Sequence, residues 1–152
     1  MCSFTQKRKD KTYTFNCGEQ AMMAQKALLF EDSETFDKIM ASNDPKEIKD
    51  LGRQVQNYKQ DVWDAYKYKI MVNLSHARFY QNEYLRGILL STGDKILVEA
   101  SPYDTIWGIG MDADTARETP DEEWKGENLL GKALTEVKNR LRKEFNNHIS
   151  VV

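Results

Sequence analysis

Apolar residues at helical intervals constrain this chain more than any other feature of its sequence. In the segment from about Asn128 to Asn146 they follow each other at steps of four, three, four and four residues: Leu130, Leu134, Val137, Leu141 and Phe145. This spacing places one apolar stripe along an α-helix. The segment from Lys59 to Gln81 also keeps helical spacing. We therefore expect a mainly helical chain.

Start and stop signals predict several shorter helices. The tetrapeptide Asp44-Pro45-Lys46-Glu47 supplies an N-cap acceptor, a proline at the first helical position and a glutamate at the third. A helix should therefore begin at Pro45. A further helix is expected from Glu19 to Phe30, where Glu19, Met23, Lys26 and Phe30 recur at helical steps on a face that is apolar and charged together. Periodic apolar residues predict helices around Phe36–Met40 and from Leu85 toward a glycine stop at Thr92-Gly93.

Two short segments favour strands. Thr12 to Phe15 alternates in the way a short strand does, and the run Ile96-Leu97-Val98 between Gly-Asp and Ser-Pro predicts a buried strand. The expected fold is α+β, a mainly helical single domain over residues 1–152 with a small β element.

Composition excludes several classes of protein. The 152 residues carry 24 acidic and 22 basic side chains, for a net charge of -2, which argues against broad nucleic-acid binding through a basic face. Cys2 and Cys17 are too few for a disulfide framework, and the polar N-terminal segment is unlike an export signal, so we expect a cytoplasmic protein. No stretch is apolar enough to span a membrane, and we expect no membrane partner.

The first group of candidate functional residues lies on the helix from Glu19 to Phe30. Glu19 follows Cys17-Gly18 at the loop-to-helix junction, and Lys26 comes seven residues later on the same helical face. Their α-carbons should be ~10 Å apart, too far for the direct pairing of residues four apart. Both side chains could still contact one bound molecule. Each also has an ordinary alternative, because an acidic first-turn residue complements the helix dipole and a lone lysine is usually solvated.

The second group lies in the loop from Glu99 to Gly110, after the expected strand. This loop contains the carboxylates of Glu99 and Asp104, two aromatic residues and two glycines. Such mixtures at strand ends often bind ligands. The ordinary alternative for Trp107 is a place in the core, and Gly108-Ile109-Gly110 lacks the later glycine of a dinucleotide-binding motif.

Histidine and cysteine offer little further chemistry. Neither His76 nor His148 is placed by the sequence as a base for Cys17, which we expect to be a free buried thiol. No His or Cys pair has metal-ligand spacing, so neither a metal nor a cofactor is expected. The basic run Lys7-Arg8-Lys9 fits a solvated surface that could also touch phosphate.

An ordered series of motifs resembles one known family, the NADAR or YbiA-like superfamily, over most of the chain from about Phe15 to Leu141. The matching residues are Cys17-Gly18-Glu19-Gln20, Lys26-Ala27, Phe30, Pro45, Gly52-Arg53, Lys69, Phe79, Gln81-Asn82, Leu85, Leu90, Thr92-Gly93, Leu97–Pro102, Asp104, Trp107-Gly108, Gly110, Trp124, Gly126, Asn128 and Leu130-Gly131. The resemblance implies a YbiA-like α+β fold and an N-glycosidase. Substrates in that family are phosphoribosylated intermediates of riboflavin biosynthesis or ADP-ribose attached to guanine, including guanine of DNA or RNA.

The resemblance also implies roles for individual residues. Glu19, Lys26 and Asp104 correspond to catalytic positions, and a further set would bind substrate: Trp107, Gly108, Gln20, Asn82, Glu99 and Asn128. Gln20 stands where the family usually has histidine, and Met1–Phe4 replaces a longer Phe-Ser-Asn-Phe segment expected to help hold the phosphoribosyl group. Gln20 removes an imidazole from the pocket, and the loss of the segment bears on substrate identity more than on reaction type.

The implied chemistry suits these residue types. Cleavage of an N-glycosidic bond builds positive charge on the ribose and negative charge on the departing base, so a carboxylate and a proton donor both help. Glu19 or Asp104 could fill either role, and Trp107 would stack on the base. A neutral Lys26 could instead attack the sugar and form a Schiff base. Asn82 and Asn128 could bind sugar hydroxyls or equally cap helices.

Three hypotheses about function follow from the sequence. The leading one is an N-glycosidase acting on a phosphoribosyl or ADP-ribosyl substrate. The alternatives are a non-catalytic module that binds ADP-ribose or a nucleotide, and an interaction module with a degenerate pocket. Retention of Glu19, Lys26, Asp104 and Trp107 together favours the enzyme.

Overall fold

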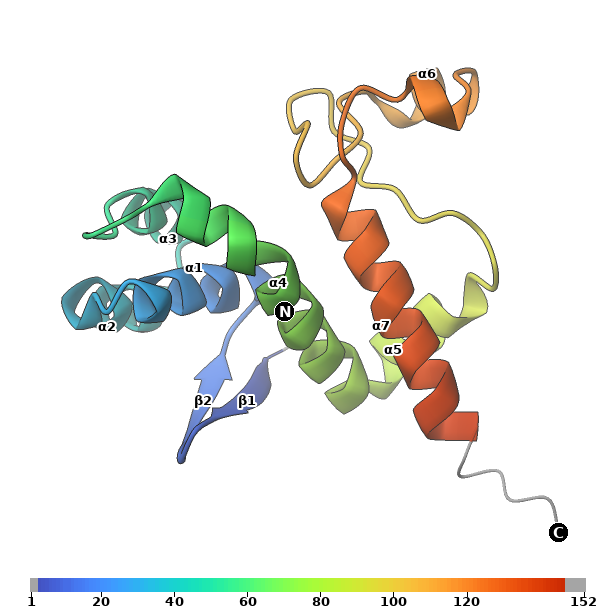
Figure 1. Ribbon diagram of the computed structural model, residues 1–152. Coiled ribbons are helices and arrows are strands. Elements are labelled where there is room, and N and C mark those ends of the chain that lie inside the picture. Colours follow the sequence, from blue (N-terminus) through green and yellow to red (C-terminus); the bar gives the residue numbers. More distant parts are fainter. Residues whose placement is uncertain (1–2, 147–152) are drawn as a thin grey trace, which may run out of the picture. The chain divides into compact units, whose positions relative to one another are not determined.

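The computed structural model describes residues 3–146 and divides between Arg86 and Gly87 into two compact units. The first unit contains a β-hairpin, four helices and the start of a fifth, and the second unit contains the remaining helices and a long loop (Figure 1). In chain order the elements are β1 Phe4–Arg8, β2 Lys11–Phe15, α1 Gly18–Leu29, α2 Ser33–Ala41, α3 Pro45–Arg53, α4 Gln60–Gln81, α5 Glu83–Ser91, α6 Ala113–Arg117, the 3-10 helix η1 Asp121–Glu123, and α7 Leu129–Asn146. Helices dominate, as the spacing of apolar residues predicted.

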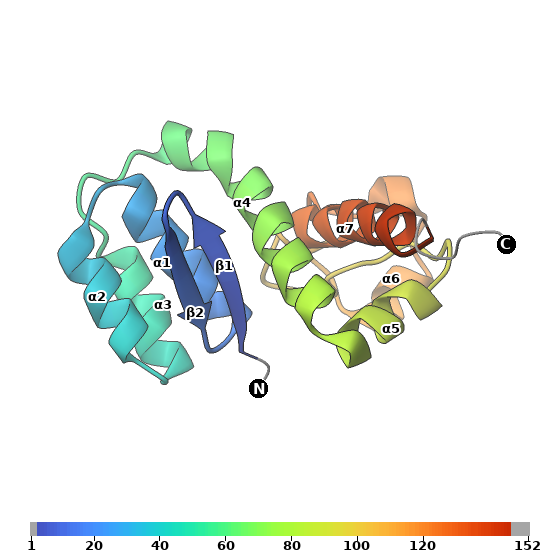
Figure 2. The same ribbon diagram turned by 90° about the horizontal axis from the view of Figure 1, so that it is seen from below.

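Helix α1 lies at the centre of the first unit. It contacts α2, α3, α4 and β2, and Figure 2 shows it beside the hairpin with α2 and α3 next to it. Ala21, Ala24 and Ala27 are each 0% exposed. Because alanine has only a methyl side chain, neighbouring elements can approach this helix closely. Its start is fixed by Cys17, whose Sγ accepts a hydrogen bond from the Gln20 backbone N–H at 3.5 Å.

The β-hairpin is the only sheet in the described part of the chain. β1 pairs antiparallel with β2, with Phe4 opposite Phe15 and Arg8 opposite Lys11. The rings of Phe4 and Phe15 lie 5.6 Å apart, and both side chains are buried. The outer side of β1 is held to α4, because Gln81 accepts from the Thr5 N–H at 2.8 Å and donates back to the Thr5 carbonyl at 2.6 Å.

Most predicted elements of the first unit are confirmed. The helices expected at Glu19–Phe30, Phe36–Met40, Pro45 and Lys59–Gln81 all form, and Asp44 caps α3 through a 3.0 Å hydrogen bond from the Lys46 N–H. The strand at Thr12–Phe15 also forms. Its partner β1 was not predicted, because Phe4 to Arg8 is mostly polar and its ladder depends on β2.

The strand predicted at Ile96-Leu97-Val98 is wrong. These residues have no regular secondary structure, and Ile96 and Val98 are 64% and 37% exposed. No second strand lies beside them among residues 3–146 to supply ladder partners. The side chain of Asn128 supplies backbone hydrogen bonds in place of a neighbouring strand. Its amide donates to the Leu97 carbonyl at 2.9 Å and accepts from the Glu99 N–H at 3.0 Å.

The second unit is built around α7 and this loop. Val137 and Leu141 of α7 are 0% exposed, as the apolar stripe predicted. A separate small cluster joins Ile109, Met111 and Ala116, with Trp124 packed against it. Lys138 is 2% exposed, and its Nζ donates to Gly93 O at 2.6 Å and Thr92 Oγ1 at 3.0 Å, which satisfies acceptors at the end of α5. No helix within residues 3–146 has the length and apolar character to cross a membrane.

A substitution at Gly131 can test how closely α7 approaches the loop that contains Leu97. A Cβ at this position would meet the Leu97 carbonyl oxygen and, at 2.5 Å, Asn128 Nδ2. Gly131→Ala should therefore lower the free energy of unfolding by about 1–3 kcal/mol, as measured by denaturant titration. The matched control is Gly87→Ala in α5, where a Cβ would meet nothing within 4 Å. It should leave stability unchanged or raise it, since alanine favours helix. Equal effects of the two changes would contradict the packing described.

Asp32 gives a pH-dependent test of the first unit. Its Oδ2 accepts from the Gln56 N–H at 2.8 Å and its Oδ1 from the Thr35 N–H at 3.0 Å. These bonds, the one from Gln56 foremost, hold the pKa of the Asp32 carboxyl below its usual value. The stabilisation is therefore present above the unfolded pKa of about 3.9 and is lost as pH falls through the lower folded value.

Asp32→Asn places an amide donor against the Gln56 N–H, so it should cost about 1–2 kcal/mol at neutral pH. The difference from the original protein should shrink below about pH 4, measured by urea unfolding across pH. Asp44→Asn, which keeps an exposed cap, should change stability by less than about 0.5 kcal/mol. A cost for Asp32→Asn that does not vary with pH would contradict the assignment.

Candidate functional site

Lys26 occupies the most distinctive chemical environment in the first unit. Its side chain extends from α1 across the packed helices, and Nζ donates to the Gly52 carbonyl in α3 at 2.8 Å. The same nitrogen lies 4.6 Å from the ring centroid of Tyr58 and 5.7 Å from that of Trp63. Among residues 3–146, the ammonium therefore has aromatic faces and one carbonyl as neighbours, and it forms no ion pair with a carboxylate. We call Lys26, Gly52, Tyr58 and Trp63 the lysine cage.

The lysine cage changes the acidity of its amine. Burial lowers the pKa of Lys26, and the positive charge of Arg53 lowers it further. Both effects disfavour the protonated form. A lysine with a lowered pKa has a larger neutral fraction at neutral pH, and the neutral amine is the nucleophilic form.

The cage is held together by contacts outside it. Tyr58 lies 5.3 Å from the ring of Phe30 and donates from its hydroxyl to Gln60 Oε1 at 2.8 Å. Two residues earlier, the Gln56 N–H is bound by Asp32. The loop between α3 and α4 is therefore anchored where it places Tyr58 against Lys26.

Glu19 and Gln20 lie side by side in the first turn of α1 but differ in exposure. Glu19 is exposed. Gln20 is 1% exposed; its Oε1 accepts from the Asn16 N–H at 2.7 Å, and its Nε2 donates to the carbonyls of Ile39 and Ser42 at 3.1 Å each. The Gln20 amide thus links α1 to the end of α2 by hydrogen bonds. Few of its donors and acceptors remain to bind a substrate group.

Asn82 also has a local structural use. Its Oδ1 accepts from the Leu85 N–H at 2.9 Å at the start of α5. This is the helix-capping alternative that the sequence left open.

In the second unit, Asp104 organises the loop that carries Trp107. Its Oδ1 accepts from the N–H groups of Ile106 at 3.0 Å and Trp107 at 2.8 Å, and its carbonyl accepts from Gly110 at 3.1 Å. Gly110 has a φ of 72°, which glycine adopts without strain. The carboxylate, both backbone groups and the glycine together fix a tight turn, with Asp104 and Trp107 half-buried.

This turn is docked on the N-terminus of α7. The carbonyls of Thr105, Gly108, Ile106 and Trp107 accept, in that order, from the N–H groups of residues 127 to 130 at 2.8 to 3.1 Å. The first amides of a helix lack intrahelical partners, so the loop satisfies donors that would otherwise need water. The Asp104–Trp107 turn and the helix start therefore form one structural element.

Three further residues predicted to bind substrate meet in the same place. A Cβ on Gly108 would lie 2.8 Å from the carbonyl oxygens of both Asp104 and Glu99. Glu99 uses its carbonyl to accept from Ile109 at 3.0 Å, and Asn128, 8% exposed, uses its amide on the backbone of Leu97 and Glu99. Asn128 has a φ of 53°. The geometry explains Gly108 and Asn128 by packing and backbone hydrogen bonds.

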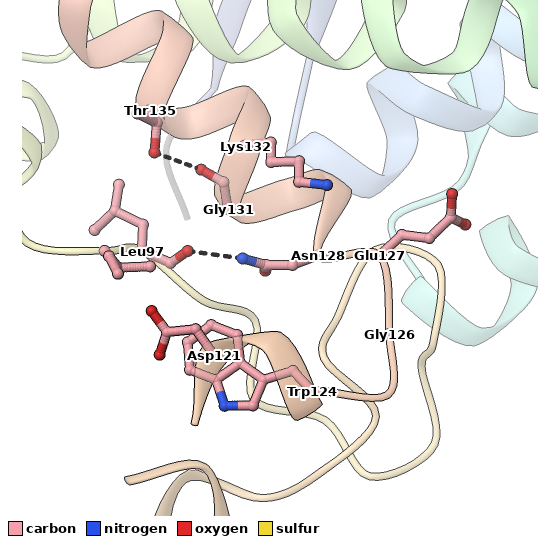
Figure 3. Close-up of a pocket in the computed structure, with 10 residues that line it drawn as sticks. Leu97, Asp121, Trp124, Gly126, Glu127, Asn128, Gly131, Lys132 and Thr135 are labelled. Atoms are coloured by element: carbon pink, nitrogen blue, oxygen red, sulfur yellow. Dashed lines mark hydrogen bonds between the residues drawn. The ribbon is translucent and has the colours of Figure 1, made fainter. Parts of the chain in front are cut away.

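A pocket of about 420 Å³ opens beside this element. Figure 3 shows α7 residues, among them Lys132 and Thr135, on one side of it and Asp121 and Trp124 on the other. Its lining also includes Glu127 and Asn128. One cation, two carboxylates and an indole give it mixed polar and apolar character.

The structure groups the predicted residues within each unit. Glu19, Gln20, Lys26 and Asn82 belong to the first unit, and the other set to the second: Glu99, Asp104, Trp107, Gly108 and Asn128. Sequence reasoning missed Tyr58 and Trp63 as neighbours of Lys26. Trp63 lies within the helix predicted from Lys59 to Gln81, whose spacing gives no sign of a contact with Lys26, and Tyr58 lies in a loop without a local pattern.

The structure also shows the surroundings of the cysteine and the histidine that lie within the described residues. Cys17 is a free thiol, as expected, but it is half-buried and not fully buried, because its sulfur caps α1. His76 in α4 lies 5.7 Å from the ring of Tyr80. Cys2 and His148 lie outside the described residues. Within residues 3–146 no three His, Cys, Asp or Glu side chains gather as metal ligands.

Comparisons with known proteins identify relatives of the whole chain. The model of the NADAR domain family matches residues 1–142. N-glycosidase R617 of Acanthamoeba polyphaga mimivirus is 48% identical over 79% of this chain and 71% of its own length. Riboflavin biosynthesis protein PYRR of Arabidopsis thaliana is 30% identical over 79% of this chain, which spans 19% of the plant protein.

A solved structure agrees with the fold. The NMR structure of the Escherichia coli protein YbiA has a TM-score of 0.72 and 28% identity, and the match covers 97% of this chain and 78% of that protein. The predicted α+β, mainly helical YbiA-like fold is confirmed. The relatives' names support an N-glycosidase, as predicted, and not the alternative of a non-catalytic binding module.

The electrostatic origin of the Lys26 environment can be tested without a substrate. Arg53→Gln removes a neighbouring positive charge that lowers the pKa of Lys26. The pKa should rise, so the neutral fraction at a given pH should fall. Pulse labelling with acetic anhydride, followed by mass spectrometry of the Lys26 peptide, should show the reactivity curve displaced to higher pH.

The matched control is Arg142→Gln, which removes another ion-paired arginine, 3.3 Å from Asp94 in the second unit. It should leave the Lys26 curve in place. An Arg53→Gln curve that stays in place or moves to lower pH would show that Arg53 does not act on this amine.

Proposed function

Because the chain belongs to the NADAR domain family, we propose that it is an N-glycosidase that uses Lys26 as its nucleophile to cleave the bond between a ribose carbon and a base nitrogen. The single observation that carries this proposal is the lysine cage. Nucleophilic lysines need a lowered pKa, and Lys26 has one through burial beside Tyr58 and Trp63 and through the charge of Arg53.

The cage also suits the charge changes of the reaction. The neutral amine fits a half-buried place that no carboxylate of the described chain shares as an ion-pair partner. The positive charge that develops on the nitrogen during attack is met by the Tyr58 ring and the Gly52 carbonyl. The same attraction also favours the protonated resting amine, so the lowered pKa requires burial and the charge of Arg53 to outweigh it.

The proposed reaction passes through a covalent intermediate on Lys26. The Lys26 Nζ electron pair forms a bond to the anomeric carbon while the bond from that carbon to the base nitrogen breaks, and the base leaves with the bonding electrons and takes up a proton. Nζ then loses one proton, which balances the proton taken up by the base, and its second proton passes to the ring oxygen as the ribose ring opens, which leaves a neutral imine and a sugar hydroxyl. Water adds to the same carbon, the C–N bond to lysine breaks, and the free sugar and the neutral amine are released.

Glu19 is the proposed proton donor in this unit. It lies seven residues before Lys26 on α1 and is exposed, so a bound substrate can reach it. A carboxylic acid that protonates the leaving base is the usual general-acid contribution. Asp104 remains the alternative donor, with the additional structural role of fixing the Trp107 turn.

The substrate class proposed is a base-linked phosphoribosyl or ADP-ribosyl group. Two substrates are candidates. One is a phosphoribosylated intermediate of riboflavin biosynthesis, in line with the name of the plant relative, and the other is ADP-ribosylated guanine in DNA or RNA. Trp107 is proposed to stack on the base, and Glu99 is proposed as a further substrate-binding residue. Gln20, Asn82 and Asn128 are proposed to act by positioning backbone. A cytoplasmic location completes the proposal.

Trapping of the imine tests the mechanism. Borohydride added during turnover of either substrate should reduce the imine and leave a ribosyl adduct on the Lys26 peptide, detected by mass spectrometry. Lys26→Arg keeps a cation in the cage but cannot form an imine, so it should abolish trapping and lower kcat by at least about a hundredfold. Glu19→Gln should lower kcat by about 10²–10⁴ with KM little changed, if Glu19 moves a proton.

The matched control is Lys38→Ala, which removes an exposed lysine 3.5 Å from Glu34 in α2. It should leave both trapping and turnover intact. Full turnover by Lys26→Arg would eliminate the imine route and leave direct attack by water, assisted by Glu19 or Asp104. Absence of turnover of both substrates by the original protein would overturn the proposed substrate class.

A further inference from the structure

A second pocket lies in the first unit, on a part of the surface that the proposed reaction does not use. It has a volume of about 330 Å³ and is lined by β1, α1 and α4. The lining residues are Gln6, Lys7, Arg8, Gln25, Leu29, Tyr66, Ile70 and Asn73. Figure 2 shows β1 on the α4 side of the hairpin, with α1 behind it. None of the lysine cage residues belongs to this lining.

The polar side of the pocket is built on a buried amide. Gln25 is 6% exposed, and its Oε1 accepts from Arg8 Nη1 at 3.2 Å while its Nε2 donates to Gln6 Oε1 at 2.7 Å. One glutamine therefore holds two side chains of β1 in place. The Arg8 guanidinium has five N–H donors, of which this bond uses one. The arginine is thus oriented in advance at the pocket wall.

The charge of the lining has one sign. Lys7 and Arg8 are cationic, and no aspartate or glutamate is among the lining residues. The surrounding segment from Lys7 to Lys11 carries four basic side chains and one acidic one, whereas the whole chain has a net charge of -2. A local excess of positive charge in an acidic protein attracts anions to one place on its surface. Arg8 shares its face of β1 with Gln6, and an oriented guanidinium suits phosphate oxygens in particular. Lys7, the preceding residue of the strand, adds positive charge to the same region.

The opposite wall offers a stacking surface. Tyr66 of α4 is 51% exposed, and Ile70 lies one turn further along the same helix. An exposed aromatic ring next to an apolar side chain accepts the face of a planar ring, and base stacking on such rings tolerates any base. The side-chain amides of Asn73 and Gln6 also line the pocket, and such amides can hydrogen-bond sugar hydroxyls.

We propose that the pocket formed by Gln6, Arg8 and Gln25 with Tyr66 binds a nucleoside phosphate, with the phosphate on Arg8, the charge of Lys7 attracting it to this region, and the base on Tyr66. This chemistry has two sources, a free nucleotide or one nucleotide of a nucleic-acid strand. The site does not require turnover at Lys26, because it is a separate binding surface. Its failure and a failure of the proposed reaction are therefore distinguishable.

Binding to the full chain tests the site. Isothermal titration at low salt with AMP, adenosine, inorganic phosphate and a short single-stranded oligothymidylate compares the parts of the ligand. AMP should bind at least about tenfold more tightly than adenosine, and its affinity should fall as salt rises. The double change Lys7→Gln with Arg8→Gln should weaken AMP binding at least about tenfold, and Tyr66→Leu should weaken it by about tenfold through lost stacking.

The hairpin provides a matched control. Lys9→Gln with Lys11→Gln removes the same charge from the same segment at residues that do not line the pocket, so affinity should change by less than about threefold. Lys26→Arg should bind AMP as the original protein does. Circular dichroism melting of every variant confirms that each one folds.

The oligonucleotide distinguishes the two sources. Tighter binding of the oligothymidylate than of AMP, with AMP competing for it, identifies a strand as the ligand; equal or weaker binding identifies a free nucleotide. Either result supports the site if the Lys7/Arg8 variant no longer binds that ligand. The proposal is overturned if AMP and the oligonucleotide both fail to bind, or if the Lys9/Lys11 control weakens binding as much as the Lys7/Arg8 change.

Discussion

Close packing around α1 is the constraint on which the first unit depends. Three alanines without exposed surface let its neighbours approach the helix backbone, and Gln20 ties its first turn to the end of α2. Because the helix cannot rotate without losing these contacts, the direction of Lys26 is fixed. Its amine reaches the Gly52 carbonyl and the faces of Tyr58 and Trp63. The chemistry assigned to the lysine is therefore a consequence of how the helix packs.

The second unit depends on a different constraint, the unsatisfied amides at the start of α7. Four carbonyls of the Asp104–Trp107 region accept from them, and Gly108, Gly126 and Gly131 allow the backbones to come this close. A side chain at any of the three positions would meet a carbonyl oxygen. The glycine-rich motifs of this segment are explained by backbone packing, which in turn presents Asp104 and Trp107 in a defined turn.

The sequence predicted what is locally encoded. α1, α3 and α7 follow from caps and helical spacing within their own segments. Lys26 was identified as a candidate on α1, and its catalytic role was implied by the family resemblance. The lysine cage was not foreseen, because Gly52, Tyr58 and Trp63 come from separate segments and meet only through tertiary packing. The strand at Ile96–Val98 was wrong for a related reason: β-branched composition does not reveal whether a partner strand exists. Likewise, the backbone hydrogen bonds made by the side chains of Gln20 and Asn128 depend on residues 19 and 31 positions away.

The central claim is that packing of α1 places Lys26 where its amine is neutral more often than a solvated lysine. The most direct measurement is an NMR titration of the Lys26 side chain, with ¹³Cε-labelled lysine and Lys26→Arg to assign the signal. We expect this resonance to titrate below the value of about 10.4 typical of a solvated lysine and below the exposed Lys38 in the same spectrum. A Lys26 resonance that titrates with Lys38 or above it would contradict the account.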